Sequence, residues 1–268
     1  MTTEDREDLP AQEQEDSRSS HSNGESRDKE QLPLWQETIL LLGVALGLAI
    51  LIKAVLVQAF YIPSESMEPG LVKNDRILVQ KVSYWGSASP QRGDVVVFKD
   101  PGGWLPPMPK TGARAVVTNV MAKIGLYPEG GHLVKRVIGV AGDKIKCCDA
   151  KGRIMVNGTP LDEGSYVKVD DPNTPEDEDG QCRGPMKGTC KWTAGPVPEG
   201  HLFVMGDNRA HSADSSYHLC APQATDCVDS DAYVPVGDVV GKVFVVLWPA
   251  NHFRWVTRPD DFTEVTSP

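Results

Sequence analysis

The chain has 268 residues, of which 40% are hydrophobic, so it can bury the core of one large domain or two small ones. Its 25 glycines and 21 prolines indicate many turns and short strands, but are too few for a collagen-like or fully disordered polymer. The formal net charge is -10, and residues 1–37 supply -7 of it, leaving only -3 for the remainder. Neither part has the basic surplus that neutralises phosphates, which excludes nucleic acid as a partner.

The amino terminus is a polar, acidic segment. Residues 1–33 consist mainly of Glu, Asp, Ser and Gln, with very few apolar side chains. Such a composition cannot offset the entropy lost on ordering. We therefore predict a disordered acidic tail over residues 1–34.

A long apolar run follows this tail. The range Thr38–Val57 contains one charged residue, Lys53, and about 20 helical residues are what a bilayer core requires. Trp35 before the run and Phe60 after it resemble aromatic residues at membrane interfaces. We expect a single transmembrane anchor over residues 35–59. A buried helix is the alternative, whereas a cleaved signal peptide fits poorly because a long acidic tail precedes the run.

Charge alone leaves the orientation of this anchor open. Arg27 and Lys29 on the tail side are matched by Lys53 and Lys73 on the other side. All the cysteines follow the anchor, and this distribution favours an oxidising exterior for residues 58–268. We therefore predict a cell-membrane protein with a cytoplasmic amino terminus and an extracytoplasmic main domain.

Six cysteines lie in the second half of the chain, and none has the CxxC or His-flanked spacing of a zinc site. They are Cys147, Cys148, Cys182, Cys190, Cys220 and Cys227. Closure of short loops favours disulfides between Cys182 and Cys190 and between Cys220 and Cys227, which leaves the adjacent Cys147 and Cys148. The connectivity stays open at this point, and free buried thiols are the alternative.

Short apolar stretches bounded by Gly, Pro and Asp predict a strand-rich domain after the anchor. The predicted strands lie within 76–82, 93–98, 132–140, 153–161, 201–207 and 239–248. The pair Asn157-Gly158 marks a tight hairpin turn. The run 239–248 is too short to cross a bilayer as a helix, so we interpret it as a strand.

Two other segments have a different pattern. Residues 111–124 place apolar side chains on one helical face, so we expect a helix that packs on the sheet or touches lipid. Residues 168–183 are rich in Asp, Glu, Pro and Gly. We interpret them as a solvated surface loop, with a calcium site as the alternative, although the ligand pattern of an EF-hand is absent.

The first segment with candidate catalytic residues lies just beyond the predicted anchor. In FYIPSESMEPGL, residues 60–71, prolines impose fixed backbone turns around Ser64 and Ser66. A serine becomes a good nucleophile only when a base removes its proton. His211 or His218 with a nearby Asp could form a triad, but neither serine has the GxSxG sequence of a nucleophile elbow.

A lysine is the other candidate base. In a strand, Lys135 shares a face with Leu133 and Val137, whereas Arg136 points to the opposite face. A lysine can act as a base near pH 7 only if burial lowers its pKa by several units, and an apolar strand face provides such burial. An ordinary surface lysine on an edge strand is the alternative.

Four segments together resemble the bacterial type I signal peptidases, membrane-anchored Ser/Lys endopeptidases that remove signal peptides from secreted proteins. The segments are SESMEPGL, RGDVVVF, LVKRVIGVAGDKI and GDNRAHSADS. They occur in the order of the family after an amino-terminal anchor, and they span residues 60–216. The last segment, considered alone, could equally be a polar turn.

The resemblance implies a role for several residues. Ser66 would be the nucleophile and Lys135 the general base. The Ser64 hydroxyl would stabilise the oxyanion together with the backbone N–H of Ser66, and Ser212 would hydrogen-bond and orient the Lys135 amine.

Charged residues around the dyad would support it. Asp207 would pair with Arg136 behind the base strand, and Asp214 matches another acid of the family. The chain departs from many relatives at Ala210-His211, where they have Asp-Asn, and at Ser216, where they have arginine. These changes place a salt bridge to Asp214 in question.

The resemblance also implies two shallow pockets for small substrate residues at the -1 and -3 positions. The matching side chains are Ile62, Met67, Leu71, Ile77, Val97 and Val134. Ordinary core packing is the alternative role for these residues, especially for Ile77 and Val97.

The overall expectation is a mainly β, signal-peptidase-like catalytic fold with one amino-terminal transmembrane helix. The peptidase domain would cover residues 60–250, with insertions at 101–131 and 147–200 and a tail at 251–268. Its substrates would be exported preproteins, with the lipid bilayer and the secretion machinery as further partners and no cofactor or metal. The alternatives are a self-cleaving Ser/Lys protease of the repressor type and a non-catalytic, membrane-anchored binding module.

Overall fold

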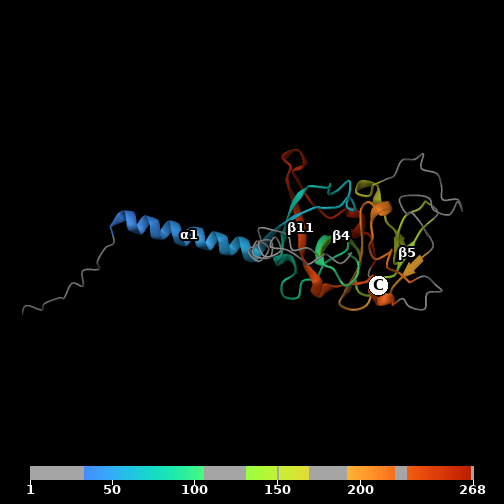
Figure 1. Ribbon diagram of the computed structural model, residues 1–268. Helices are drawn as coiled ribbons and strands as arrows, with labels where there is room; N and C mark the ends of the chain where they lie inside the picture. Colours follow the sequence, from blue (N-terminus) through green and yellow to red (C-terminus); the bar gives the residue numbers. More distant parts are fainter. Residues whose placement is uncertain (1–32, 106–130, 150, 169–191, 221–227, 267–268) are drawn as a thin grey trace, which may run out of the picture. The chain divides into compact units, whose positions relative to one another are not determined.

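A computed structural model describes residues 33–105, 131–149, 151–168, 192–220 and 228–266. The chain divides into two compact units, residues 1–45 and 46–268. One α-helix, α1, covers Leu34–Leu56, and the second unit is built mainly from strands (Figure 1). The strand-rich class expected from the sequence is therefore confirmed.

Helix α1 corresponds to the apolar run in which the sequence predicts an anchor, but it ends at Leu56, and residues 57–59 of the predicted anchor lie in a strand, β1 (Val57–Tyr61). Large apolar side chains along it are exposed, for example Leu42 at 67% and Ile50 at 60%. Across the part of the chain that the structure describes, no helix combines the length and apolarity needed to cross a bilayer.

The main structure is an eight-stranded sheet, in which the strands follow the order β1-β2-β11-β3-β4-β9-β10 and β12 pairs with β11. The strands are β1 Val57–Tyr61, β2 Arg76–Gln80, β3 Val95–Lys99, β4 His132–Gly139, β9 His201–Met205, β10 Val234–Pro235, β11 Val239–Trp248 and β12 Arg254–Trp255. All of the recorded pairings between these strands are antiparallel. The predicted strand 239–248 is thus confirmed as β11, which lies between β2 and β3.

A smaller four-stranded sheet has the order β7-β6-β5-β8. Its strands are β5 Ile145–Cys147, β6 Met155–Val156, β7 Thr159–Pro160 and β8 Trp192–Ala194. The predicted hairpin at Asn157-Gly158 connects β6 to β7, and both turn residues have a positive φ, 51° and 84°. This pair of left-handed residues is what a tight hairpin turn requires.

Short 3-10 helices connect the strands. They are η1 Val82–Tyr84, η2 Glu163–Ser165, η3 Arg209–His211, η4 Asp229–Ala232, η5 Val236–Asp238, η6 Ala250–His252 and η7 Asp260–Thr263. The predicted helix at 111–124 lies outside the described residues, as does nearly all of the acidic loop at 168–183.

Apolar side chains pack on both faces of the larger sheet. On one face, Leu133 and Val137 of β4 cluster with Val96 and Phe98 of β3. On the other face, Val134 belongs to a second cluster, which also contains the apolar side chains of the β1–β2 region. A third cluster fills the space around the smaller sheet. Alternate residues of β4 therefore serve different clusters, as the period of two predicts.

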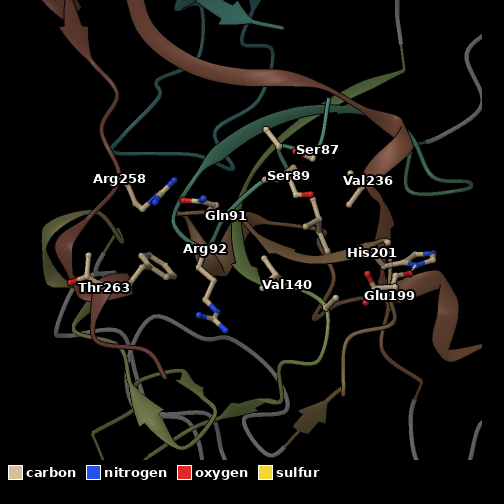
Figure 2. A pocket seen from close by; sticks show the side chains of 16 residues that line it. Ser87, Ser89, Gln91, Arg92, Val140, Glu199, His201, Val236, Arg258 and Thr263 are labelled. Atoms are coloured by element: carbon tan, nitrogen blue, oxygen red, sulfur yellow. Dashed lines mark hydrogen bonds between the residues drawn. The ribbon is translucent and has the colours of Figure 1, made fainter. Parts of the chain in front are cut away.

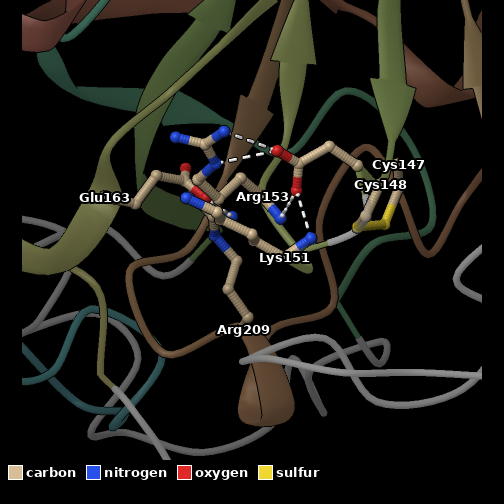
Figure 3. The surroundings of a disulfide bond; sticks show 7 residues. Cys147, Cys148, Lys151, Arg153, Glu163 and Arg209 are labelled. Carbon is tan, nitrogen blue, oxygen red and sulfur yellow. Dashed lines mark hydrogen bonds and ion pairs between the residues drawn. A yellow bond between two sulfur atoms is a disulfide. The ribbon is translucent and has the colours of Figure 1, made fainter.

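Three of the six cysteines lie in the part of the chain that the structure describes, and all three form disulfides. Cys147, at the end of β5, forms a disulfide with its neighbour Cys148 (Figure 3), and Cys220 is also disulfide-bonded. The free-thiol alternative is therefore wrong for these three residues. Cys182, Cys190 and Cys227 lie outside the described residues, so the pairing favoured for them stays a prediction.

Candidate active site

Ser66 lies in the loop that connects β1 to β2, and it is 7% exposed. The loop after β9 holds its backbone in place. The backbone N–H of Asn208 donates to the Ser66 carbonyl at 3.0 Å, and the Asn208 side-chain amide donates to the carbonyl of Glu65 at 3.1 Å. These two hydrogen bonds fasten the candidate nucleophile to the end of β9.

Lys135 reaches Ser66 from the middle of the larger sheet. It lies on β4 opposite Val96 of β3, and it is 3% exposed. Its Nζ atom donates to Ser66 Oγ at 2.7 Å. The structure thus places the candidate base in direct contact with the candidate nucleophile, although the two are 69 residues apart in sequence.

Burial lowers the pKa of Lys135 to about 8, and the nearby charges of Asp214 and Asp207 act in the opposite direction. Burial has this effect because it penalises the charged ammonium more than the neutral amine. A lysine with a pKa near 8 is neutral in a substantial fraction of molecules near pH 7.5, whereas an ordinary lysine is almost entirely protonated there. The environment of Lys135 therefore fits the requirement for a lysine base.

Ser64 lies two residues before Ser66 on the same loop. The two hydroxyl oxygens are 3.3 Å apart, and the Ser64 side chain is exposed. A hydroxyl so close to the nucleophile can donate to an oxygen that becomes negative when the nucleophile attacks. Its position is compatible with the oxyanion role that the resemblance implies.

Ser212 differs from the expectation that it binds the lysine amine. Its hydroxyl donates to Asp214 Oδ2 at 2.5 Å, and within the described residues the recorded hydrogen bond of the Lys135 amine goes to Ser66. A carboxylate is a stronger acceptor than a neutral amine, which explains this choice of partner. The Ser212 hydroxyl is therefore directed to the carboxylate and not to the amine.

Asp214 is buried, and its partners among the described residues are hydrogen-bond donors of the same loop. Besides Ser212, the backbone N–H of Gly206 donates to its Oδ2 atom at 2.9 Å, and Ser216 donates to Oδ1 from its backbone at 3.0 Å and its hydroxyl at 2.7 Å. Ser216, at the position where the resemblance implies an arginine, thus supplies hydrogen bonds and not a salt bridge.

The predicted ion pair between Arg136 and Asp207 is present behind the base strand. Arg136 Nε and Nη2 donate to the two carboxylate oxygens of Asp207 at 2.8 and 2.6 Å, and both side chains are buried. The guanidinium also lies over the ring of Tyr166, 4.4 Å from its centroid. Such a two-pronged pair fixes orientation as well as charge, so it can hold the strand that carries Lys135.

The family of the chain follows from comparison with known proteins. Residues 35–248 match the family described as signal peptidase, peptidase S26. The chain belongs to this signal peptidase family. Membership makes it a serine endopeptidase that removes signal peptides from preproteins.

Individual relatives support the same assignment. A protein named probable signal peptidase I from Mycobacterium leprae is 38% identical, over 87% of this chain and 81% of the relative. Signal peptidase I from Mycobacterium tuberculosis is 38% identical over 82% of this chain and 74% of the relative. Signal peptidase I from Leptolyngbya laminosa is 30% identical over 88% and 91%.

The residues expected to form the substrate pockets of this signal peptidase lie together in one hydrophobic cluster. Ile62, Met67, Leu71, Ile77 and Val97 are at most 2% exposed, and Val134 is partly buried against them. The cluster includes Met67, which follows the candidate nucleophile directly. The side chains thus adjoin the dyad, but most of them also serve as core.

The histidines considered as alternative bases lie elsewhere. His211 is exposed, and its Nδ1 atom lies 3.3 Å from Asn208 Oδ1. His218 stacks on Trp104 with the ring centroids 4.5 Å apart. The contacts recorded for the described residues bring Lys135, and neither of these histidines, to Ser66.

The structure also contains cavities away from the dyad. One of about 650 Å³ is lined by residues that include Ser89, Arg92, His201 and Arg258 (Figure 2). Its two arginines are already paired with buried carboxylates, Arg92 with Asp143 and Arg258 with Asp94. A smaller cavity of about 280 Å³ is lined in part by Arg136, Asp207 and Tyr166. Neither lining includes Ser66 or Lys135.

Sequence reasoning missed Asn208, Arg209 and Glu163 as neighbours of the site. Asn208 and Arg209 stand inside the motif GDNRAHSADS, so their place in that motif was a usable signal. Glu163 lies in a segment without any recognised motif, and only the folded chain brings it to Arg209. Among the described residues, no cluster of three or more His, Cys, Asp or Glu that could hold a metal is found.

Proposed function

We propose that this signal peptidase cleaves exported preproteins with Ser66 as nucleophile and Lys135 as general base. The observation that carries the proposal is the 2.7 Å contact between Lys135 Nζ and Ser66 Oγ, made by a buried lysine whose pKa is lowered to about 8. A neutral amine at this distance can accept the hydroxyl proton.

In the proposed reaction, neutral Lys135 takes the proton of Ser66 as Oγ attacks the scissile carbonyl. The Ser64 hydroxyl and the backbone N–H of Ser66 stabilise the developing oxyanion. Lys135 then returns the proton to the leaving amine as the C–N bond breaks, which leaves an acyl-enzyme. Finally, Lys135 activates a water that hydrolyses the acyl-enzyme and frees Ser66.

The preference for small residues at -1 and -3 would come from the apolar cluster beside the dyad. Five of its predicted pocket side chains are almost fully buried, so little room is left near Ser66 for a large substrate side chain. The substrate would bind in an extended form, because backbone pairing supplies affinity while shallow pockets select side chains.

We also propose the finer organisation of the chain. Residues 1–34 would be a cytoplasmic tail and 35–56 a membrane anchor. The extracytoplasmic peptidase domain would run from residue 57 to residue 266, because residues 57–59, expected in the anchor, lie in β1. Residues of the expected tail 251–268 likewise belong to the folded domain, since β12 pairs with β11 and Phe262 and Val265 are buried in the cluster around the smaller sheet. The support is the apolar run Thr38–Val57, together with the exposed leucines of α1, which would contact lipid. The bilayer and the secretion machinery would be its partners, and no cofactor would be required.

The test uses the full chain and a fluorogenic peptide with Ala-x-Ala before the scissile bond. We expect the wild type to cleave after the final Ala, and Ser66→Ala and Lys135→Ala to be inactive. His211→Ala is the matched control and should keep most of the activity. An inactive His211→Ala with an active Lys135→Ala would show that the base is wrongly assigned.

The anchor requires a separate test. Expressed in a bacterium, the full chain should sediment with membranes and resist extraction by carbonate at high pH. Protease added outside spheroplasts should digest the peptidase domain but leave the amino-terminal tail. Recovery of the chain in the soluble fraction would contradict the anchor without affecting the assignment of the dyad.

A further inference from the structure

The segment Glu163–Lys168 lies outside the motifs that identify the family, yet it contacts several parts of the active site. It begins with η2, Glu163–Ser165, which follows strand β7 of the smaller sheet. We propose that this segment, which we call the strap, positions the nucleophile loop against the loop that follows β9. The inference rests on the proposed roles of Ser66 and Lys135.

The strap first contacts the loop that carries the nucleophile. Val167 forms an isolated antiparallel bridge with Pro69, three residues after Ser66. Next to it, Lys168 Nζ lies 2.9 Å from Glu68 Oε2. The strap therefore holds the end of the nucleophile loop through backbone and side chain together.

The same segment contacts the loop after β9. The backbone N–H of Lys168 donates to the Asp207 carbonyl at 3.0 Å. At the other end of the strap, the Glu163 carboxylate pairs with Arg209, with distances of 2.5 Å to Nη2 and 3.1 Å to Nη1. The side chains of both ion-pair partners are almost fully buried, 1% exposed for Arg209 and 6% for Glu163.

Arg209 connects this ion pair to the catalytic centre. Its Nε atom donates to the carbonyl of Gly206 at 2.9 Å. Gly206 in turn donates to Asp214, and Asn208 donates to the carbonyl of Ser66. Glu163 thus acts through Arg209 on the stretch of backbone that fastens the nucleophile.

Tyr166 gives the strap a third contact, with the base strand β4. Its hydroxyl donates to Glu163 Oε1 at 3.1 Å, and its ring lies under the guanidinium of Arg136, next to Lys135. The strap therefore touches the elements that carry Ser66, Lys135 and Asp207. Outside the four motifs, it is one continuous segment that links all three.

This arrangement predicts an effect on the chemical step. A general base works only within hydrogen-bond reach of the proton, and an error of about 1 Å in placement can reduce a rate about 100-fold. Glu163 and Lys168 would act as positioning residues, since their contacts in the strap join them to Arg209, Asp207 and Glu68 rather than to the dyad. Loss of the strap contacts should therefore lower kcat more than it raises KM.

The first test is Glu163→Gln in the full chain. The change keeps the shape of the side chain but leaves the buried Arg209 without its carboxylate. We expect kcat per active site, counted with a serine-acylating titrant, to fall about tenfold or more with KM nearly unchanged. Asp149→Asn is the matched control, because it removes a carboxylate from a partly exposed pair with Arg153, and the contacts recorded for Asp149 lie within its own turn, with Lys151 and Arg153.

The second test removes a backbone donor and does not depend on a buried charge. Lys168→Pro deletes the N–H that donates to Asp207, whereas Lys168→Ala removes only the side chain and its partly exposed ion pair with Glu68. We expect the proline variant to lose several-fold more kcat per titrated site than the alanine variant. It keeps the proposal testable if Glu163→Gln does not fold.

The outcomes separate the strap from the proposed function. Reduced kcat in folded Glu163→Gln or Lys168→Pro, with an active wild type and inactive Ser66→Ala, supports the strap. Unchanged kcat per titrated site in both variants overturns it and leaves the dyad intact. If total activity falls only in proportion to the number of sites that react with the acylating titrant, the proposal is also overturned, because that result reflects loss of folded protein. An inactive wild type would instead contradict the proposed function.

Discussion

At the scale of single residues, the pKa of the candidate base depends on the balance between burial, which lowers it, and nearby negative charge, which raises it. Lys135 is buried in the sheet, and its unfavourable desolvation is only partly offset by Asp214 and Asp207. The charge of Asp214 remains available for this effect because serine hydroxyls and backbone N–H groups, which are neutral donors, surround it. The residue at position 216 therefore affects the pKa of the candidate base Lys135, because a serine there leaves the charge of Asp214 unneutralised.

The first prediction concerns the pH dependence of cleavage. Because Lys135 must be neutral to act as a base, kcat/KM should rise with pH through a midpoint near 8 and level off above it. Steady-state assays of the wild type from about pH 6 to about pH 10 would measure the midpoint. A midpoint of kcat/KM near pH 6.5 would instead indicate a histidine base.

A second prediction follows from the charge of Asp214. Burial dominates the pKa of Lys135, but Asp214 raises it, so Asp214→Asn should lower it and move the midpoint of kcat/KM to lower pH. The amide can still accept hydrogen bonds from Gly206 and Ser212, which limits other damage. A midpoint that moves to higher pH in this variant would contradict the electrostatic argument.

A third prediction concerns the stability cost of the buried lysine. Since burial lowers its pKa, the folded state at pH 7 contains an ammonium that is more stable in the unfolded chain. Lys135→Met should abolish cleavage yet raise the free energy of unfolding at pH 7 by about 1–3 kcal/mol. Denaturant titration at pH 7 measures this, and the gain should shrink between pH 8 and 10.4, where the folded lysine becomes neutral first. A Lys135→Met variant that is less stable than the wild type by the same amount at every pH would contradict this prediction.

At the scale of elements, the site is made where the end of β9 meets the nucleophile loop. The two segments approach closely at Gly206, where an added Cβ would lie 2.4 Å from both the Ser66 carbonyl and Ser212 Oγ. Behind this junction, the pair of Arg136 and Asp207 joins β4 to the same loop. The close backbone contact holds the nucleophile loop against the loop after β9, and the buried ion pair holds the base strand β4 against that same loop.

The fourth prediction is that Gly206→Ala inactivates the enzyme. Its methyl group must push the Ser66 carbonyl or Ser212 away, and a shift of about 1 Å can reduce the rate about 100-fold. Gly237→Ala is the matched control, because a Cβ there meets no atom within 4 Å. Comparable kcat/KM in the two variants would show that the close approach has no catalytic effect.

The fifth prediction concerns the ion pair behind the base. Asp207→Asn would leave Arg136 buried without a matching charge, which costs about 3–5 kcal/mol of folding free energy. The control Asp149→Asn, in a partly exposed pair, should cost at most about 1 kcal/mol. Urea denaturation of both variants measures the difference, and similar losses would contradict the importance of burial.

At the scale of the whole molecule, the peptidase unit begins with a strand directly after α1. Val57 is the first residue of β1, which pairs along its full length with β2. Phe60 of β1 also belongs to the cluster that contains the predicted substrate pockets. The Leu56 carbonyl also accepts a hydrogen bond from the backbone N–H of Lys81 at 3.0 Å, just after β2, so the sheet uses the chain from Leu56 onward.

A truncation tests the proposed division of labour between anchor and peptidase unit. A chain that begins at Leu56 should cleave a soluble peptide at a rate similar to the full chain. It should process preproteins in membranes at least about tenfold more slowly, because anchoring raises the local concentration. A chain that begins at Ile62 lacks β1 and should lose folding cooperativity in thermal denaturation. Equal processing of preproteins by the full chain and the first truncation would contradict the anchor.

Local patterns in the sequence determined the type of the helix and of most of the longer strands among the described residues. Short apolar stretches bounded by Gly, Pro and Asp predicted β2, β3, β4, β9 and β11, and Asn157-Gly158 predicted a hairpin, because strand and turn conformation depend on neighbouring residues. The motifs also indicated Ser66 and Lys135 without any knowledge of their geometry. Very short strands such as β10 and β12 carry too few residues for such a pattern.

Only the tertiary structure decided which residues meet. It directed the Ser212 hydroxyl to Asp214 instead of Lys135. It also brought Glu163 to Arg209, 46 residues away, in a contact without a local signal. The physical reason is that burial, hydrogen-bond competition and charge pairing depend on neighbours in space, which the order of residues along the chain does not specify.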